Sequence, residues 1–215
     1  MIQTADRPAA LADLNVLVHS CHSCPLGNTR TKAVPGEGNI DADIMLIGEA
    51  PGYYEDQQGR PFVGAAGQFL EQLLGSIGLK RHEVFIANVV KCRPPQNRDP
   101  LPEEIGACSD WLGQQLDIIR PKVVVTLGRY SLARFLPGQS IGRIHGQARK
   151  VAGQWVMPMY HPAAALHQGS LRKTIEDDFR KIPAILEVAM KEQQPVLVMQ
   201  PTVPETPAVE QGKLF

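Results

Sequence analysis

Short apolar runs alternate with helical patterns along most of this chain, and this alternation constrains its fold more than any other feature. Helical patterns are centred on residues 11–19, 64–77, 102–119 and 171–191. The apolar runs have the length of strands, and the first three are apolar throughout, as in strands covered on both faces. They lie at residues 43–49, 84–90, 122–128 and 155–160. The order predicts a three-layer α/β/α fold around a central, mostly parallel four-stranded sheet.

The two ends of the chain differ from this pattern. At 215 residues the chain can build one domain with a substantial core, which we assign to residues 1–192. Residues 193–215 carry several prolines and no periodic apolar pattern, which predicts a disordered tail.

Charge and terminal composition exclude several classes of protein. Lys plus Arg equals Asp plus Glu at 22 each, so any surface for nucleic acid must be local. The N-terminus lacks the basic and apolar regions of a signal peptide, and no apolar run approaches the length of a membrane span. We therefore expect a cytoplasmic protein without a membrane partner, acting as a monomer.

The four cysteines of the chain, Cys21, Cys24, Cys92 and Cys108, have a spacing that indicates a metal centre. A two-residue gap lets two thiolates face one ion or cluster, and two distant thiols can complete a shell of four sulfurs. A reducing cytoplasm favours metal binding over disulfides. The residues alone leave zinc, an iron–sulfur cluster and free buried thiols open.

Polar or glycine-rich residues follow the predicted strands, where parallel α/β sheets bind their ligands. Glu49 lies in the turn at residues 48–52, and Phe62 lies in the loop at residues 59–67. A flat heteroaromatic ligand could stack on Phe62, and the amide of Asn88 suits the edge of a pyrimidine. His161 could donate to a developing oxyanion. Each residue alone also has an ordinary structural reading, as a core, turn or strand-end residue.

In combination these motifs resemble one known family. The sequences GEAPG at 48–52, GRPFVGAAG at 59–67, NVVKCRPP at 88–95 and HPAAAL at 161–166, with the four cysteines, are similar to the family-four uracil-DNA glycosylases. These are the iron–sulfur branch of the uracil-DNA glycosylase superfamily. The resemblance runs from Cys21 to about Ile185.

The resemblance implies a 4Fe-4S cluster on the four cysteines, with a structural role. It also implies a repair enzyme that hydrolyses the N-glycosidic bond of uracil in DNA, leaving an abasic site for base excision repair. Glu49 would support the attacking water or the sugar cation, and His161 would stabilise the leaving uracil oxygen. The substrate-binding residues would be Ala50, Glu55, Phe62, Asn88 and His145.

Contacts to single- or double-stranded DNA follow from the same resemblance. Leu166 would be inserted into the minor groove, and Arg143, Arg172 and Lys173 would contact the DNA backbone. The loop at residues 93–101 could offer further basic groups to phosphate. The last five residues, Gln211–Phe215, resemble the peptide by which bacterial repair proteins dock on the replication sliding clamp.

Two other functions stay open. One is a cross-linking or non-catalytic uracil-DNA-binding relative that uses His145, because a cross-linking branch of the superfamily traps the sugar on a histidine. Ala50, where that branch typically has Gln, and the short segment at residues 142–145 argue against it. The second alternative is a cluster-bearing component of a polymerase assembly with a vestigial pocket, which the intact Glu49 and His161 argue against.

Overall fold

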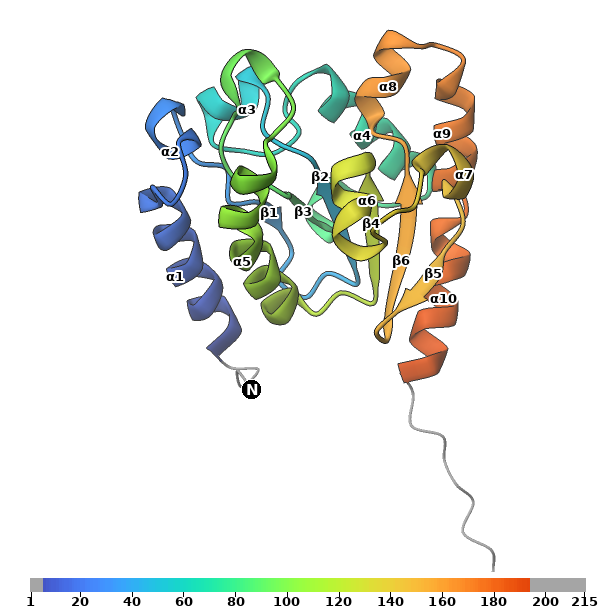
Figure 1. Ribbon diagram of the computed structural model, residues 1–215. Coiled ribbons are helices and arrows are strands. Elements are labelled where there is room, and N and C mark those ends of the chain that lie inside the picture. The colour runs from blue at the N-terminus through green and yellow to red at the C-terminus, as the bar shows by residue number, and fades with distance from the viewer. Residues whose placement is uncertain (1–5, 194–215) are drawn as a thin grey trace, which may run out of the picture.

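Residues 6–193 are described by the computed structural model, and they contain one six-stranded mixed sheet between helices (Figure 1). The strand order is β1-β3-β2-β4-β6-β5. The four central strands are parallel, and each edge strand is antiparallel to its neighbour. Their bounds are β1 Glu37–Gly38, β2 Ile44–Gly48, β3 Phe85–Asn88, β4 Val123–Leu127, β5 Arg149–Val151 and β6 Gln154–Met159.

The predicted α/β class and its parallel four-stranded centre are confirmed, and the two edge strands are additional. β1 and β5 have only two and three residues, none of them fully buried, so they carry no apolar run. β5 and β6 form a hairpin whose turn residues, Ala152 and Gly153, have φ angles of 47° and 88°. Such positive angles suit the twist of a tight hairpin.

Most long helices begin and end close to their predicted positions. They are α1 Arg7–Ser20, α4 Ala65–Ser76 and α5 Pro102–Ile119. α5 begins with Pro102, whose missing N–H costs nothing in a first turn, and Glu104 accepts the N–H of Leu101 at 2.8 Å. The short helices, which the sequence pattern did not predict, are α2 Leu26–Thr29, α3 Tyr53–Gln58, α6 Arg129–Phe135, α7 Ile141–Ile144 and α8 Pro162–His167.

The prediction of a single helix at residues 171–191 is wrong, because the structure has two helices there. α9 spans Leu171–Phe179 and α10 spans Ile182–Gln193. Pro183 lies in the first turn of α10. In a continuous helix its ring would clash with the carbonyl four residues earlier, that of Phe179, which is where α9 ends.

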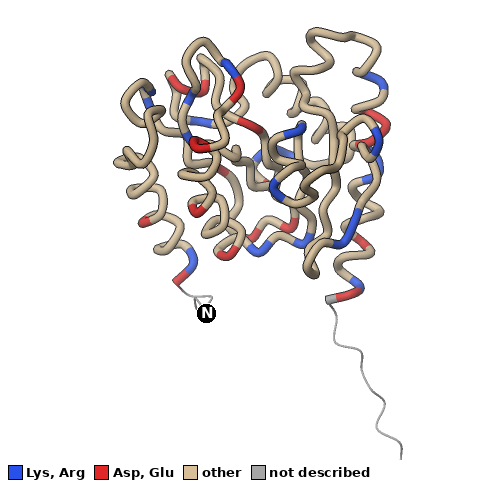
Figure 2. Tube along the Cα trace, in the orientation of Figure 1, with Lys and Arg blue, Asp and Glu red and all other residues tan. Residues whose placement is uncertain are grey.

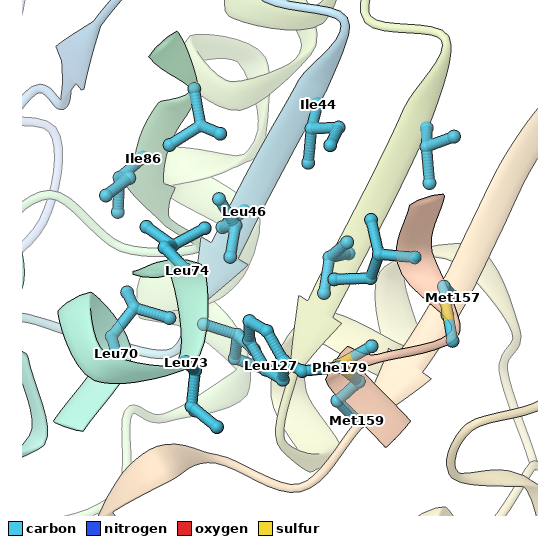
Figure 3. Packing of buried hydrophobic residues seen from close by; sticks show 14 of the residues in the cluster. Ile44, Leu46, Leu70, Leu73, Leu74, Ile86, Leu127, Met157, Met159 and Phe179 are labelled. Carbon is cyan, nitrogen blue, oxygen red and sulfur yellow. The ribbon is translucent and has the colours of Figure 1, made fainter. Parts of the chain in front are cut away.

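The two faces of the sheet support two separate apolar cores. In β2, Ile44 and Leu46 belong to one core while Met45 and Ile47 belong to the other, as the two-residue period of a strand requires. The first core packs α4, α9 and α10 against the sheet. Figure 3 shows Leu70, Leu73 and Leu74 of α4 and Phe179 of α9 in this core. The second packs α5 and the segment around Leu26. Burial on both faces explains why these strands are continuously apolar.

Because the four central strands are parallel, their carboxyl ends meet at one edge of the sheet. There β2 leads into Glu49, β3 ends at Asn88, β4 leads into Gly128, and β6 leads into Tyr160 and His161. Gly48 and Asn88 are direct neighbours in the β2–β3 register. Figure 1 places α3 and α8 at this same end of the sheet.

No helix within residues 6–193 is long and apolar enough to cross a membrane. Of the tail predicted at residues 193–215, Gln193 is the last residue of α10, and the rest, including Gln211–Phe215, lies outside the described residues.

Candidate active site

A cavity of about 770 Å³ lies at the carboxyl ends of the parallel strands. Six of the residues expected to act on the substrate line it: Glu49, Ala50, Glu55, Phe62, Asn88 and His161. Further lining residues include Asp99, Arg129, Ile141 and Tyr160. The fold therefore brings together residues that lie more than 100 positions apart in the sequence.

Asn88 supplies the most informative polar atom of this cavity. Its side chain is 2% exposed, and its Oδ1 has no hydrogen-bond partner among the described residues. A buried acceptor without a partner costs about 1–3 kcal/mol. A Cβ atom at Gly48 would lie 2.4 Å from this Oδ1 and 2.7 Å from the Phe62 ring. Glycine at position 48 therefore keeps a space open beside both the amide and the ring.

Behind Asn88 lies a buried lysine that sequence reasoning missed. Lys91 Nζ donates to the backbone oxygen of Asn88 at 2.8 Å and to Gln115 Oε1 at 2.6 Å. Gln115 in turn donates to the backbone oxygen of Pro35 at 2.7 Å. Burial lowers the pKa of Lys91 to about 8. The chain thus fixes the end of β3 with a charge-assisted hydrogen bond inside the protein.

Phe62 has a φ angle of 51°, a backbone conformation that residues other than glycine rarely adopt. Two residues hold it there. Glu55 Oε1 accepts the N–H groups of Val63 and Gly64 at 2.8 and 2.9 Å. Arg81 donates to the backbone oxygens of Phe62 and Pro61. The described contacts of Glu55 are therefore with the loop that carries Phe62, and no sequence pattern had indicated Arg81.

His161 lies at the N-terminus of α8 with a defined tautomer. Its Nδ1 accepts the N–H of Ala163 at 3.1 Å, so the ring proton of a neutral imidazole resides on Nε2. Burial lowers the pKa of His161 to about 4, which keeps the ring neutral at pH 7. The ring stacks on Phe62, with 5.4 Å between centroids and 23° between planes. Nε2–H is then a neutral hydrogen-bond donor in the cavity wall.

Glu49 follows β2 and is half-buried in the cavity wall. Burial raises its pKa to about 6, and the negative charge of Asp99 adds to this, whereas Arg129 opposes it. Arg129 also forms an ion pair with Asp99. A carboxylate with this pKa is ionised at neutral pH and can stabilise a cation or accept a proton from water.

The four cysteines surround a second, smaller cavity. Cys21, Cys24, Cys92 and Cys108 all line it, together with Lys91 and Trp111. None of them forms a disulfide within the described residues, and no group of three or more His, Cys, Asp or Glu side chains there is arranged to hold a single metal ion.

Two hydrogen-bond donors point at cysteine sulfurs of this cavity. Arg30 Nη1 lies 3.0 Å from Cys92 Sγ, and the N–H of Lys91 lies 3.2 Å from Cys108 Sγ. Donors of this kind stabilise thiolates. The donor set therefore suits a thiolate-bound cluster.

His145 does not line the substrate cavity, contrary to the expectation from sequence. Its Nδ1 lies 2.7 Å from Oδ2 of the buried Asp178, and its ring lies against Tyr160 with 4.8 Å between centroids. Lys181 donates to the other oxygen of Asp178 at 2.7 Å. Tyr160 lines the cavity, so His145 lies one layer behind the wall. This position gives no support to covalent trapping of a sugar.

The residues expected to contact DNA differ in the exposure of their side chains and in the contacts that these side chains already make. Leu166 is 50% exposed at the end of α8, and Arg143 is exposed in α7. Lys173 is exposed and pairs with Asp177 at 3.1 Å. Arg172 packs over the ring of Phe69 and bonds to Glu176 and Gln72.

Acidic and basic residues alternate along much of the described chain. Figure 2 shows acidic and basic residues interspersed along the chain. In the loop at residues 93–101, Arg98 is held by the buried Glu104 at 2.7 Å. Any surface for nucleic acid on the described residues would therefore have to be local.

Comparison with known proteins agrees with this geometry. Residues 35–184 match the model of the family described as the uracil DNA glycosylase superfamily. A type-4 uracil-DNA glycosylase of Sulfurisphaera tokodaii is 52% identical over 177 residues, covering 77% of this chain and 80% of the relative. One from Archaeoglobus fulgidus is 48% identical, covering 80% and 92%. A type-5 uracil-DNA glycosylase of Pyrobaculum aerophilum is 33% identical, covering 67% and 71%.

The part of the sequence that matches the family model includes the cavity-lining residues from Glu49 to His161 and the strand ends that carry them. The chain belongs to the uracil-DNA glycosylase superfamily, and its similarity to type-4 members places it with that branch.

Proposed function

We propose that this protein hydrolyses the N-glycosidic bond between uracil and deoxyribose in DNA, releasing uracil and leaving an abasic site for base excision repair. The observation that carries the proposal is the unpartnered Oδ1 of Asn88 in the cavity wall beside Phe62. Relatives that cover most of this chain are named type-4 uracil-DNA glycosylases.

Recognition follows from the donor and acceptor pattern of the base. Uracil presents an N3–H donor beside two carbonyl oxygens, and Asn88 Oδ1 is an acceptor in need of a donor. Cytosine presents an unprotonated N3 at that position, which would leave Oδ1 unsatisfied and facing another lone pair. A site built around one hydrogen bond rejects the analogue that lacks it. Phe62 provides a flat apolar surface for a base flipped out of DNA, with the backbone of Ala50 nearby.

Bond cleavage requires stabilisation of two developing charges. As the bond between C1′ and N1 breaks, its electron pair leaves with uracil and negative charge develops on the carbonyl oxygen beside N1. A neutral His161 can donate its Nε2–H to that oxygen without giving up the proton. The sugar becomes an oxocarbenium-like cation, which the carboxylate of Glu49 stabilises. Water then adds at C1′ and loses a proton, with Glu49 as the acceptor.

A 4Fe-4S cluster is the group that the four thiols suit best in this proposal. Cys21, Cys24, Cys92 and Cys108 would hold it, and the donors from Arg30 and Lys91 to sulfur would stabilise it. When bound it would cross-link the N-terminal segment to β3 and α5, a structural contribution with no step in the reaction. Cysteines that form no disulfide among the described residues suit the reducing cytoplasm, where we place the protein.

DNA would approach the cavity from the side of α8. Leu166 is the exposed apolar side chain there and would fill the space that the flipped nucleotide leaves. Arg143 and Lys173 have exposed side chains that could contact phosphate, whereas Arg172 would first have to leave its partners on α4. We also propose, from its sequence alone, that Gln211–Phe215 docks on the sliding clamp.

Replacing Asn88 tests the proposal directly. With a single-stranded oligonucleotide that contains one uracil, the wild-type protein should release free uracil, and Asn88→Ala should lower kcat/KM about 100-fold. The control is Asn39→Ala, an exposed amide before the amino end of β2, which should leave kcat/KM unchanged. Equal rates for wild type and Asn88→Ala would contradict the proposed recognition.

The pKa of Glu49 predicts how the rate depends on pH. Because the ionised carboxylate is required and its pKa is about 6, the single-turnover rate should rise with pH through about 6 and level off above it. Because His161 stays neutral over this range, it adds no second change in rate above pH 5. Glu49→Gln should lose activity by orders of magnitude and show no inflection. A wild-type rate that is flat from pH 5 to pH 8 would exclude this role.

The metal content of the purified protein tests the cluster. We expect a brown protein with about four iron atoms per chain. Cys92→Ala should lose most of the iron and unfold at a lower temperature. Ser23→Ala, which removes a hydroxyl 3.4 Å from Cys21 Sγ but no thiol, should keep the iron. A colourless protein with one zinc ion per chain would overturn the assignment.

Clamp docking is tested by truncation. A chain lacking residues 211–215 should lose binding to the purified sliding clamp in a pull-down and keep full excision activity on a free oligonucleotide. Unchanged clamp binding after truncation would refute this part of the proposal alone.

A further inference from the structure

Two adjacent tyrosines on α3 are exposed beside the substrate cavity. Tyr53 and Tyr54 are 51% and 61% exposed. Gly52 and Glu55, which flank them in the sequence, both line the cavity, whereas the tyrosines lie outside its lining. They therefore lie at its rim. Exposed aromatic side chains at the mouth of a binding site indicate a surface that holds a further part of the ligand.

The tyrosine pair is held in a fixed arrangement with a cation. The two rings lie 5.4 Å apart, at 79° to each other. The guanidinium of Arg93 lies 5.1 Å from the centre of the Tyr53 ring, and Arg93 Nε donates to Asn97 Oδ1 at 2.7 Å. Asn97 lines the cavity. Tyr53 therefore contacts both Arg93 and Tyr54.

Tyr54 is the more exposed residue of the two and contacts the loop that carries Phe62. A Cβ atom at Gly64 would lie 3.5 Å from Tyr54 Cδ2, so this ring lies next to the Gly64 backbone. That backbone is held by Glu55. The ring of Tyr54 and the ring of Phe62 are thus positioned by the same fixed loop, one outside the cavity and one inside it.

We propose that Tyr54, supported by Tyr53 and Arg93, stacks on the base next to the uracil in single-stranded DNA. The inference rests on the proposed function, because it places the flipped uracil in the cavity. The surface is continuous with the cavity mouth, and Arg93 complements the charge of the phosphate that joins the two nucleotides. In a duplex the neighbouring base stays stacked and paired, so the contact belongs to single strands.

Such a contact would favour single-stranded substrates without selecting a sequence. Every base has a flat π-face, and stacking on an aromatic side chain tolerates all four bases. Because both nucleotides then bind to parts fixed by Glu55, binding the neighbour would also orient the sugar of the uracil nucleotide between them.

The experiment compares oligonucleotides with and without the neighbouring base. Three single strands carry one uracil each: one with normal neighbours, one with a base-free residue 5′ of the uracil, and one with it 3′. For wild type, kcat/KM should fall about tenfold on one of the two base-free strands and stay unchanged on the other. Tyr54→Ala should lose about tenfold on the normal strand and nothing further on the sensitive strand, and Tyr54→Phe should behave as wild type.

Leu17→Ala, an exposed apolar residue on the distant helix α1, is the matched control and should equal wild type on all three strands. The proposal is overturned if wild type ignores both base-free residues. It is also overturned if Tyr54→Ala loses the same factor on every strand, because that result indicates a structural role. Failure of the proposed function has a separate signature, since wild type would then release no uracil from any strand.

Discussion

The rest of this structure depends on the hydrogen bonds of Lys91, which connect the substrate cavity to the cysteine-lined cavity. Its buried ammonium group donates to the backbone oxygen of Asn88 and to Gln115 of α5. Its own backbone oxygen accepts the N–H of Val34 at 2.8 Å, and its N–H points at Cys108 Sγ. One residue thus links the end of β3, α5, the segment before β1 and the cysteine-lined cavity. Burying a charge is costly unless it is fully hydrogen-bonded, so this network specifies one arrangement of the pocket wall.

The substrate cavity concentrates features that cost stability. Asn88 Oδ1 is buried without a partner, Phe62 has a positive φ, and burial holds the pKa of His161 near 4 and that of Glu49 near 6. In the proposed reaction each of them would have a use: Asn88 would accept N3–H, Phe62 would stack on the base, His161 would donate to the leaving uracil, and Glu49 would stabilise the sugar cation. The two apolar cores of the sheet offset these costs, and such local exceptions are expected where a protein binds and reacts.

Much of the fold could be predicted because burial on both faces makes the central strands continuously apolar, and parallel strands place their carboxyl ends together. That reasoning brought Glu49, Asn88 and His161 to one edge, and the structure puts them around one cavity. The short edge strands carry no apolar run, and the break between α9 and α10 depends on Pro183. Lys91 and Arg81 bond to Gln115 and to the backbone oxygen of Phe62, which lie 24 and 19 residues away, and no sequence spacing encodes such contacts. His145 lies outside the cavity lining and bonds to Asp178, a partner 33 residues away that no sequence pattern indicated.

The central claim is that Asn88 reads uracil while His161 stabilises its departure. A crystal structure of the Glu49→Gln variant, trapped on a single-stranded oligonucleotide that contains uracil, tests this claim most directly. The account predicts that uracil lies in the cavity against Phe62, with N3 within hydrogen-bond distance of Asn88 Oδ1 and the carbonyl oxygen beside N1 facing His161 Nε2. A flipped uracil that contacts neither Asn88 nor His161 would contradict it.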